Sequence, residues 1–203
     1  MIVIVDYGVG NLASVHNMFR KIGAKDVVIS GDEKKIAEAD KLLLPGVGAF
    51  DAGMNNLERS GLIPVLNHKV MEEKKPVLGI CLGMQLLTKK SEEGVKSGLG
   101  WIDAETIRFR PDPSLHLKVP NMGWNYVKVT RENPLLEMDS HSRFYFVHSY
   151  YVKCFDEKQS IATSNFGIDF TCMVNKGNIF GAQFHPEKSL RFGMRILETF
   201  IQL

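Results

Sequence analysis

The feature that most restricts the fold of this chain is a regular alternation of short apolar runs and helical patterns in residues 2–90. The apolar runs, which are typical of strands buried on both faces, are residues 2–5, 27–29, 42–44 and 77–80. The helical patterns are residues 11–22, 33–39, 50–59, 63–73 and 82–90. This alternation predicts an open, mostly parallel, doubly wound α/β sheet of the flavodoxin-like type.

After Gly94 the pattern changes to strands with few helices between them. Strands are predicted at residues 102–109, 126–129, 144–147, 160–164, 170–174 and 179–184, and a last helix at about 189–203. Residues 120–125 are predicted to form a turn that Trp124 anchors. Such a succession favours an antiparallel extension of the same sheet. Because no linker or repeat interrupts the chain, we expect residues 1–203 to form one domain.

Composition argues against several classes of function. A net charge of +2 gives no indication of nucleic-acid or membrane binding. No apolar run approaches the roughly 20 residues of a membrane span, and the N-terminus lacks a signal-peptide pattern. The 3 cysteines are odd in number, and no CxxC or HxxxH spacing occurs, which argues against disulfides and metal ligation. We therefore expect a cytoplasmic protein without a metal or a cofactor.

The motif that carries chemistry is Gly79-Ile80-Cys81-Leu82-Gly83, between a predicted strand and a predicted helix. It resembles the nucleophile elbow of α/β hydrolases, with cysteine in place of serine. The glycines permit a tight turn, and the helix N-terminus favours a thiolate and directs backbone N–H groups at a developing oxyanion. A lone cysteine is more often a buried structural thiol, but the glycines and the turn favour a nucleophile.

A His-x-Glu motif near the other end of the chain supplies possible partners for this cysteine. His185 follows a predicted strand, so its ring is expected at the carboxyl edge of the sheet, where Cys81 also lies. His185 could act as general base, and Glu187 could hold its imidazole in one tautomer. The alternatives are a structural histidine and a solvated acid at a helix start.

Glycine-rich loops also follow two of the predicted strands. In residues 44–50, Gly46-Val47-Gly48 could turn a backbone N–H toward the site as an oxyanion loop, or form a plain β-to-α turn. Residues 8–13 match the G-x-G-x-x-A form of the dinucleotide fingerprint, with Asp32 and Glu33 at about the expected ~20-residue spacing. That match is short and competes with Cys81 for the same sheet edge, so nucleotide binding is the weaker interpretation.

Motifs in order along the whole chain carry a resemblance to a known family. They are VDYGVGN, LPGVGAF, GICLGMQ, PNMGWN, FVHSYY and QFHPEKS. GICLGMQ and HPE resemble the class I glutamine amidotransferases, and the other motifs narrow the resemblance to the glutaminase subunits of imidazole glycerol phosphate synthases. The resemblance implies that the chain hydrolyses L-glutamine to L-glutamate and ammonia through a thioester on Cys81. It also implies that the ammonia passes to a synthase subunit in L-histidine biosynthesis.

The resemblance further implies a role for individual residues. Cys81, His185 and Glu187 would form the catalytic triad, and the backbone of Val47 and Leu82 the oxyanion hole. The residues expected to line the glutamine pocket are Gly48, Gln85, Ser149 and Tyr150. The residues expected to face the partner, a (β/α)8-barrel subunit in a heterodimer, are Asn11, Met122, Trp124 and Lys188.

One position departs from the family pattern. Asn121 stands where the family commonly has histidine before Met-Gly-Trp-Asn. Asparagine keeps hydrogen-bonding capacity but does not titrate near neutrality. The partner therefore stays open, because related paralogues supply ammonia for sugar modification of surface polysaccharides. Further alternatives are a non-catalytic interaction module, a cysteine peptidase and a thiol-based stress protein, although no triad or elbow position is broken.

Overall fold

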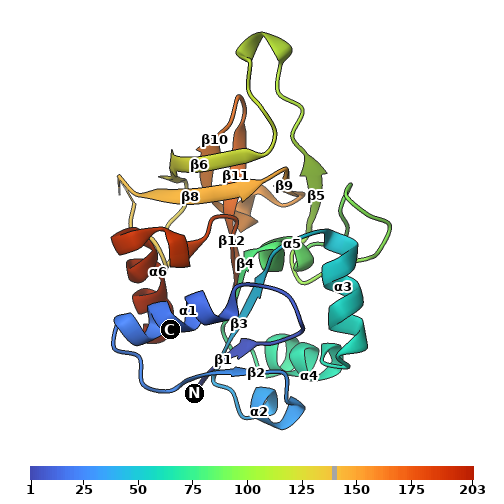
Figure 1. The fold of residues 1–203 in the computed structure, drawn as a ribbon, viewed down its shortest axis with the longest axis vertical. Coiled ribbons are helices and arrows are strands. Elements are labelled where there is room, and N and C mark those ends of the chain that lie inside the picture. Colours follow the sequence, from blue (N-terminus) through green and yellow to red (C-terminus); the bar gives the residue numbers. More distant parts are fainter. Residues whose placement is uncertain (139–140) are drawn as a thin grey trace.

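A computed structural model describes residues 1–138 and 141–203 and contains the predicted mostly parallel sheet (Figure 1). The parallel neighbours are, in order, β2 (Val27–Ser30), β1 (Ile2–Val5), β3 (Lys41–Gly46), β4 (Val77–Cys81) and β12 (Ile179–Ala182). The antiparallel extension continues through β11 (Asp169–Lys176), β10 (Ser160–Asn165) and β7 (Lys128–Val129). From β11 it also branches to β9 (Tyr150–Cys154) and β5 (Ala104–Arg108). The predicted fold class is therefore confirmed.

Helices cover both faces of the parallel strands, as a doubly wound sheet requires (Figure 1). On one face, Ile4 of β1 shares a buried cluster with Phe19 and Phe200, which belong to α1 (Leu12–Lys21) and α6 (Leu190–Gln202). On the other face, the neighbouring Val3 shares a cluster with residues of α2 (Glu33–Ala37), α3 (Phe50–Arg59) and α4 (Ile63–Asn67). No helix among the described residues is long and apolar enough to cross a membrane.

A separate pair of strands corrects the prediction of a turn at residues 120–125. β6 (Asn121–Tyr126) pairs antiparallel with β8 (Arg143–His148), placing Trp124 opposite Tyr145. Every second residue of β6 is exposed, because the other face of this pair packs on the core. The backbone N–H of His185 donates to the Tyr145 carbonyl at 2.9 Å, which attaches the pair to the segment that follows β12.

Two predicted helices are shorter than their sequence patterns indicate. α5 (Leu82–Leu86) does not reach residue 90, because N–H groups of a later segment take its last carbonyls. Leu99 N–H donates to the Leu86 carbonyl at 2.8 Å, and Ile102 N–H donates to the Leu87 carbonyl at 3.0 Å. The pattern at 63–73 divides into α4 and a π-helical stretch, His68–Glu72. Such tertiary contacts override local periodicity.

The turn between β4 and α5 is close-packed at both of its glycines. A Cβ on Gly83 would lie 1.7 Å from the Leu44 carbonyl oxygen of the neighbouring β3. A Cβ on Gly79 would lie 2.7 Å from the Gly83 carbonyl oxygen. The glycines are therefore required by contact, since any side chain would push α5 off β3.

We expect Gly83→Ala to lower the free energy of unfolding by about 3 kcal/mol or more, because the methyl group clashes with a backbone atom that cannot move alone. Urea unfolding measures this change. Gly177→Ala is the control, because its Cβ meets open space and only its φ of 60° is unfavourable, which costs about 1 kcal/mol. Equal losses in the two variants would contradict the contact argument.

Candidate active site

Cys81 ends β4 and immediately precedes α5, at the carboxyl edge of the sheet. Its backbone has φ 54° and ψ −110°, a strained conformation for a residue with a side chain. In the β3–β4 register Cys81 lies opposite Gly46, the first residue of the glycine loop. The turn therefore presents the thiol of Cys81 beside that loop, as the elbow motif predicts.

His185 and Glu187 form a buried pair after β12, the other neighbour of β4. His185 Nδ1 lies 2.8 Å from Glu187 Oε1, and the two side chains are only 2% and 3% exposed. This contact fixes the ring orientation and leaves Nε2 for chemistry. In the described chain Nε2 is buried without a partner in hydrogen-bond geometry, although the Cys81 sulfur is near enough to influence the ring.

The charge state of His185 follows from these neighbours. Burial alone would lower the pKa of the imidazole, because a charged ring is poorly solvated there. The Cys81 sulfur and the Glu187 carboxylate outweigh that effect and raise the pKa of His185 to about 9. The ring is therefore protonated at neutral pH, and it can pair with a thiolate and donate a proton.

The glycine loop after β3 is held at both ends but not in its middle. At one end, the Tyr7 hydroxyl donates to the Pro45 carbonyl at 2.7 Å. At the other, the Phe50 N–H donates to the Glu93 carboxylate at 2.8 Å. Between these contacts Val47 is 45% exposed, and Gly48 has a φ of 97° with open space around it. Rotation of the Val47 peptide therefore meets little steric resistance.

Gln85, Ser149 and Tyr150 line the same pocket as Cys81. Gln85 Nε2 donates to the Tyr150 carbonyl at 3.3 Å and to Gln183 Oε1 at 3.1 Å. Since both protons of this amide nitrogen are engaged, Gln85 Oε1 is the atom left to accept a hydrogen bond from a ligand.

A pocket of about 470 Å³ is lined by almost all the residues predicted to be catalytic or to bind glutamine. Its lining residues are Val47, Gly48, Ala49, Cys81, Leu82, Gln85, Glu93, Pro120, Val147, His148, Ser149, Tyr150, His185 and Lys188. Glu187 reaches the pocket through His185. Three predicted partner-facing residues lie outside it. Met122 and Trp124 are 63% and 43% exposed on β6, and Asn11 caps α1 by accepting from Ser14 N–H.

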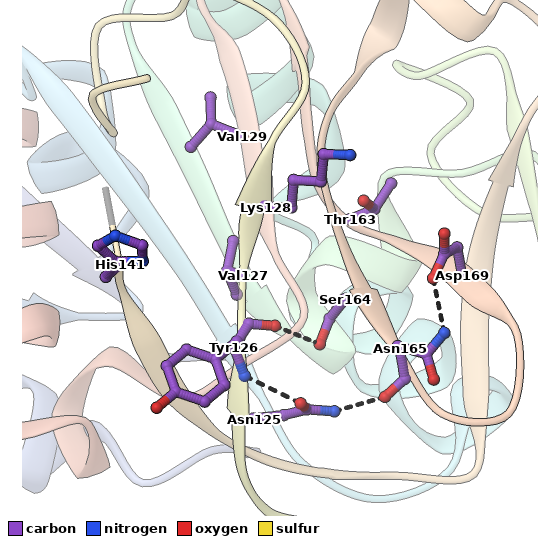
Figure 2. Close-up of a pocket in the computed structure, with 10 residues that line it drawn as sticks. All are labelled: Asn125, Tyr126, Val127, Lys128, Val129, His141, Thr163, Ser164, Asn165 and Asp169. Carbon is purple, nitrogen blue, oxygen red and sulfur yellow. Dashed lines mark hydrogen bonds between the residues drawn. The ribbon is translucent and has the colours of Figure 1, made fainter. Parts of the chain in front are cut away.

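A larger pocket, of about 610 Å³, lies away from these residues (Figure 2). Its polar groups mostly bond to one another: Ser164 Oγ donates to the Tyr126 carbonyl, and Asn165 Nδ2 donates to Asp169. It contains no cysteine, so it offers no nucleophile comparable with Cys81. No group of His, Cys, Asp and Glu in residues 1–138 and 141–203 is placed to hold a metal ion.

Sequence reasoning missed several residues of the site. Gln183 Nε2 donates to the Cys81 sulfur at 3.7 Å. Tyr7 and Glu93 hold the glycine loop, and burial together with Cys81 raises the pKa of Tyr7, which keeps its hydroxyl neutral. Tyr7 and Gln183 stood inside recognised motifs, but Glu93 carried no local signal because it acts through a long-range contact.

Comparison with known proteins agrees with this fold. Residues 3–203 match the family described as glutamine amidotransferase class-I. The chain belongs to the class I glutamine amidotransferase family and is accordingly a glutamine amidotransferase.

Relatives narrow the position of the chain within that family. It is 54% identical over 203 residues, covering 100% of this chain and 99% of the relative, to "Imidazole glycerol phosphate synthase subunit HisH 2" of Methanococcus maripaludis. A protein of the same name from Pseudomonas aeruginosa is 52% identical over 205 residues, covering 100% of both chains. The narrower resemblance carried by the motifs is thus confirmed. A chain in the structure of PurLQS from Thermotoga maritima shares the fold, with a TM-score of 0.74, 16% identity and coverage of 99% and 96%.

The raised pKa of His185 predicts a pH dependence of stability. Protonated His185 favours the folded chain, so this contribution is complete below the ordinary value of 6.5 and is lost as the pH rises through about 9. We expect Glu187→Gln to reduce that loss, because one of the interactions that raise the pKa disappears. Urea unfolding below and above this interval measures the difference.

Glu72→Gln is the matched control, because Glu72 also pairs with a histidine, His68, but both side chains are solvent-exposed. Identical pH dependence in wild type and Glu187→Gln would show that Glu187 has no influence on the His185 proton.

Proposed function

We propose that this chain is the glutaminase subunit of an imidazole glycerol phosphate synthase, with Cys81 as nucleophile. The observation that carries the proposal is the convergence of Cys81, His185 and Glu187 at the carboxyl ends of β4 and β12, beside a pocket. Sites of open α/β sheets form at this edge. The intact elbow and His–Glu pair favour an enzyme over a non-catalytic interaction module.

In the proposed reaction, the Cys81 thiolate attacks the side-chain amide carbon of glutamine. The protonated His185 Nε2 transfers its proton to the departing nitrogen, so that ammonia leaves and a thioester remains. His185, now neutral, takes a proton from a water molecule that attacks the thioester, and glutamate is released as the Cys81 sulfur regains its charge. Glu187 holds the imidazole throughout.

The backbone N–H groups of Val47 and Leu82 are proposed as donors to the oxyanion in each half-reaction. Leu82 supports this role because it begins α5 directly after Cys81. Val47 lies in the unrestrained middle of the glycine loop, so its peptide is proposed to adopt the competent orientation only when a partner favours it. A missing donor would lower the rate by roughly 10²–10³.

The partner is proposed to dock on the exposed face of the β6–β8 pair. Met122 and Trp124 are exposed there, with Arg143 stacked at 5.5 Å on the Trp124 ring and Lys188 at 5.7 Å from the Tyr145 ring centre. Exposed aromatic and cationic side chains are frequent interface anchors. A (β/α)8-barrel subunit bound there would receive ammonia next to the pocket, in L-histidine biosynthesis. The free cysteines suit a reducing compartment, so we place the reaction in the cytoplasm.

A second candidate shares the same chemistry but has a different acceptor. Asn121 departs from the usual family pattern next to the exposed strand residues, and two of the relatives carry the number 2 in their names. A paralogous subunit that supplies ammonia for sugar modification of surface polysaccharides is therefore the alternative. Measuring which barrel-like partner the chain activates separates the two.

Cys81→Ala tests the proposed nucleophile. We expect it to abolish glutamine hydrolysis while the chain stays folded, because the thiol lines a pocket and its removal leaves no closed cavity. A glutamine-analogue electrophile such as diazo-oxo-norleucine should label Cys81 in the wild type and spare Cys154 and Cys172. Mass spectrometry of the labelled peptides identifies the site. Retained turnover, or equal labelling of the three cysteines, would refute the assignment.

The proposed docking face is tested by Trp124→Ala and Lys188→Ala. We expect weaker association and less product per glutamine consumed, because hydrolysis and ammonia delivery become uncoupled. The synthase reaction with added ammonium salt should be unchanged, since the barrel performs it. Phe155→Ala is the control, because Phe155 is also an exposed aromatic residue, 52% accessible, but lies outside this face. Wild-type affinity and coupling in both variants would place the interface elsewhere.

A further inference from the structure

We propose that Gln183 is a positioning residue for the nucleophile, whose side-chain amide holds the Cys81 sulfur in its charged form. This inference rests on the proposed function, in which Cys81 is the nucleophile. Gln183 is completely buried directly after β12, and its Nε2 donates to the Cys81 Sγ at 3.7 Å. A hydrogen bond to a charged acceptor is stronger than one to a neutral acceptor, so this donor favours a thiolate over a thiol.

The orientation of the Gln183 amide is fixed by a backbone carbonyl rather than by the sulfur. The Tyr150 carbonyl can only accept, so the Gln85 atom at 3.3 Å from it must be the nitrogen, Nε2. Gln85 Nε2 also lies 3.1 Å from Gln183, where it requires the acceptor Oε1. The remaining amide atom of Gln183, which faces Cys81, is therefore the donor nitrogen.

The same carbonyl sets the orientation of a neighbouring pair. His148 Nδ1 lies 2.7 Å from the Tyr150 carbonyl and must donate to it. His148 Nε2 is then the acceptor for Asn121 Nδ2 at 3.0 Å. Burial lowers the pKa of His148 to about 4, so its ring stays neutral above that pH. The network behind Gln183 is thus buried, oriented and uncharged at neutral pH.

Gln183 and His185 influence the Cys81 sulfur in different ways. His185 brings a positive charge that leaves with the proton during the reaction, whereas the Gln183 amide keeps its dipole throughout. Gln183 therefore acts on the sulfur whenever the thiolate is present, including after the thioester is hydrolysed. The predicted result of removing it is a nucleophile that is less ionised at a given pH.

The test is the pH profile of Cys81 alkylation by iodoacetamide, in wild type, Gln183→Met and Gln183→Glu, with mass spectrometry to follow the Cys81 peptide. Met removes the donor, and Glu replaces it with a negative charge of the same shape. We expect the midpoint to rise by about one pH unit with Met and by more with Glu, so that alkylation at neutral pH slows about tenfold or more. Burial raises the pKa of Cys154 to about 12 and raises that of Cys172, so both react slowly.

Gln159→Met is the matched control, because Gln159 is also a buried glutamine, accepting from Asp103 N–H at 3.0 Å away from Cys81. It should keep the wild-type midpoint. A wild-type midpoint in both Gln183 variants would overturn the proposal and leave Gln183 as a packing residue. The assay needs neither glutamine nor a partner, so its outcome is distinct from loss of the proposed function, which Cys81→Ala tests.

A measurement on the unaltered residue decides the matter if the variants fail to fold. The side-chain NH₂ resonances of Gln183 in ¹⁵N-labelled protein should shift with the midpoint of Cys81 alkylation, and Cys81→Ala should remove that shift. Gln183 side-chain resonances that do not shift when Cys81 ionises would overturn the proposal.

Discussion

The close contact between Gly83 and the Leu44 carbonyl is the constraint on which the rest of the site depends. It allows the β4–α5 turn to lie directly against β3, so that Cys81 and the glycine loop share one edge of the sheet. The strained backbone of Cys81 persists because the residues around it are close-packed on both sides. With β12 as the other neighbour of β4, His185 reaches the same edge, and the pocket forms between them.

Residues with local signals were predictable from the sequence, and residues that act through distant contacts were not. Buried strands such as β1 and β4 are recognisable as apolar runs. The elbow and His-x-Glu motifs are recognisable because each lies within a few consecutive residues. By contrast, Gln183 meets Cys81 across 102 positions of sequence and Gln85 across 98. The end of α5 was also unpredictable, because residues 98–102 supply the N–H groups that replace further helical turns.

The β6–β8 pair carries both the exposed face proposed for the partner and part of the pocket wall, which belong to separate motifs in the sequence. Its outer face carries Met122 and Trp124, while His148 at the end of β8 forms part of the pocket wall. The Tyr145 carbonyl of β8 accepts the His185 N–H, and the Tyr145 N–H donates to Ser189. A partner that binds at Trp124 would therefore act on a strand pair that is hydrogen-bonded directly to the segment carrying His185.

Asparagine at position 121 is uncharged at every physiological pH, so it adds no titrating group next to His148 in the pocket wall. A histidine at this position could gain or lose a proton next to His148, and the electrostatic potential in the pocket would then depend on pH. Asn121 instead donates to His148 at every physiological pH, and the low pKa of His148 keeps that ring silent as well. The pair formed by Asn121 and His148 therefore keeps the same charge across the physiological pH range, and a titration of the rate in that range would have to come from residues outside this pair.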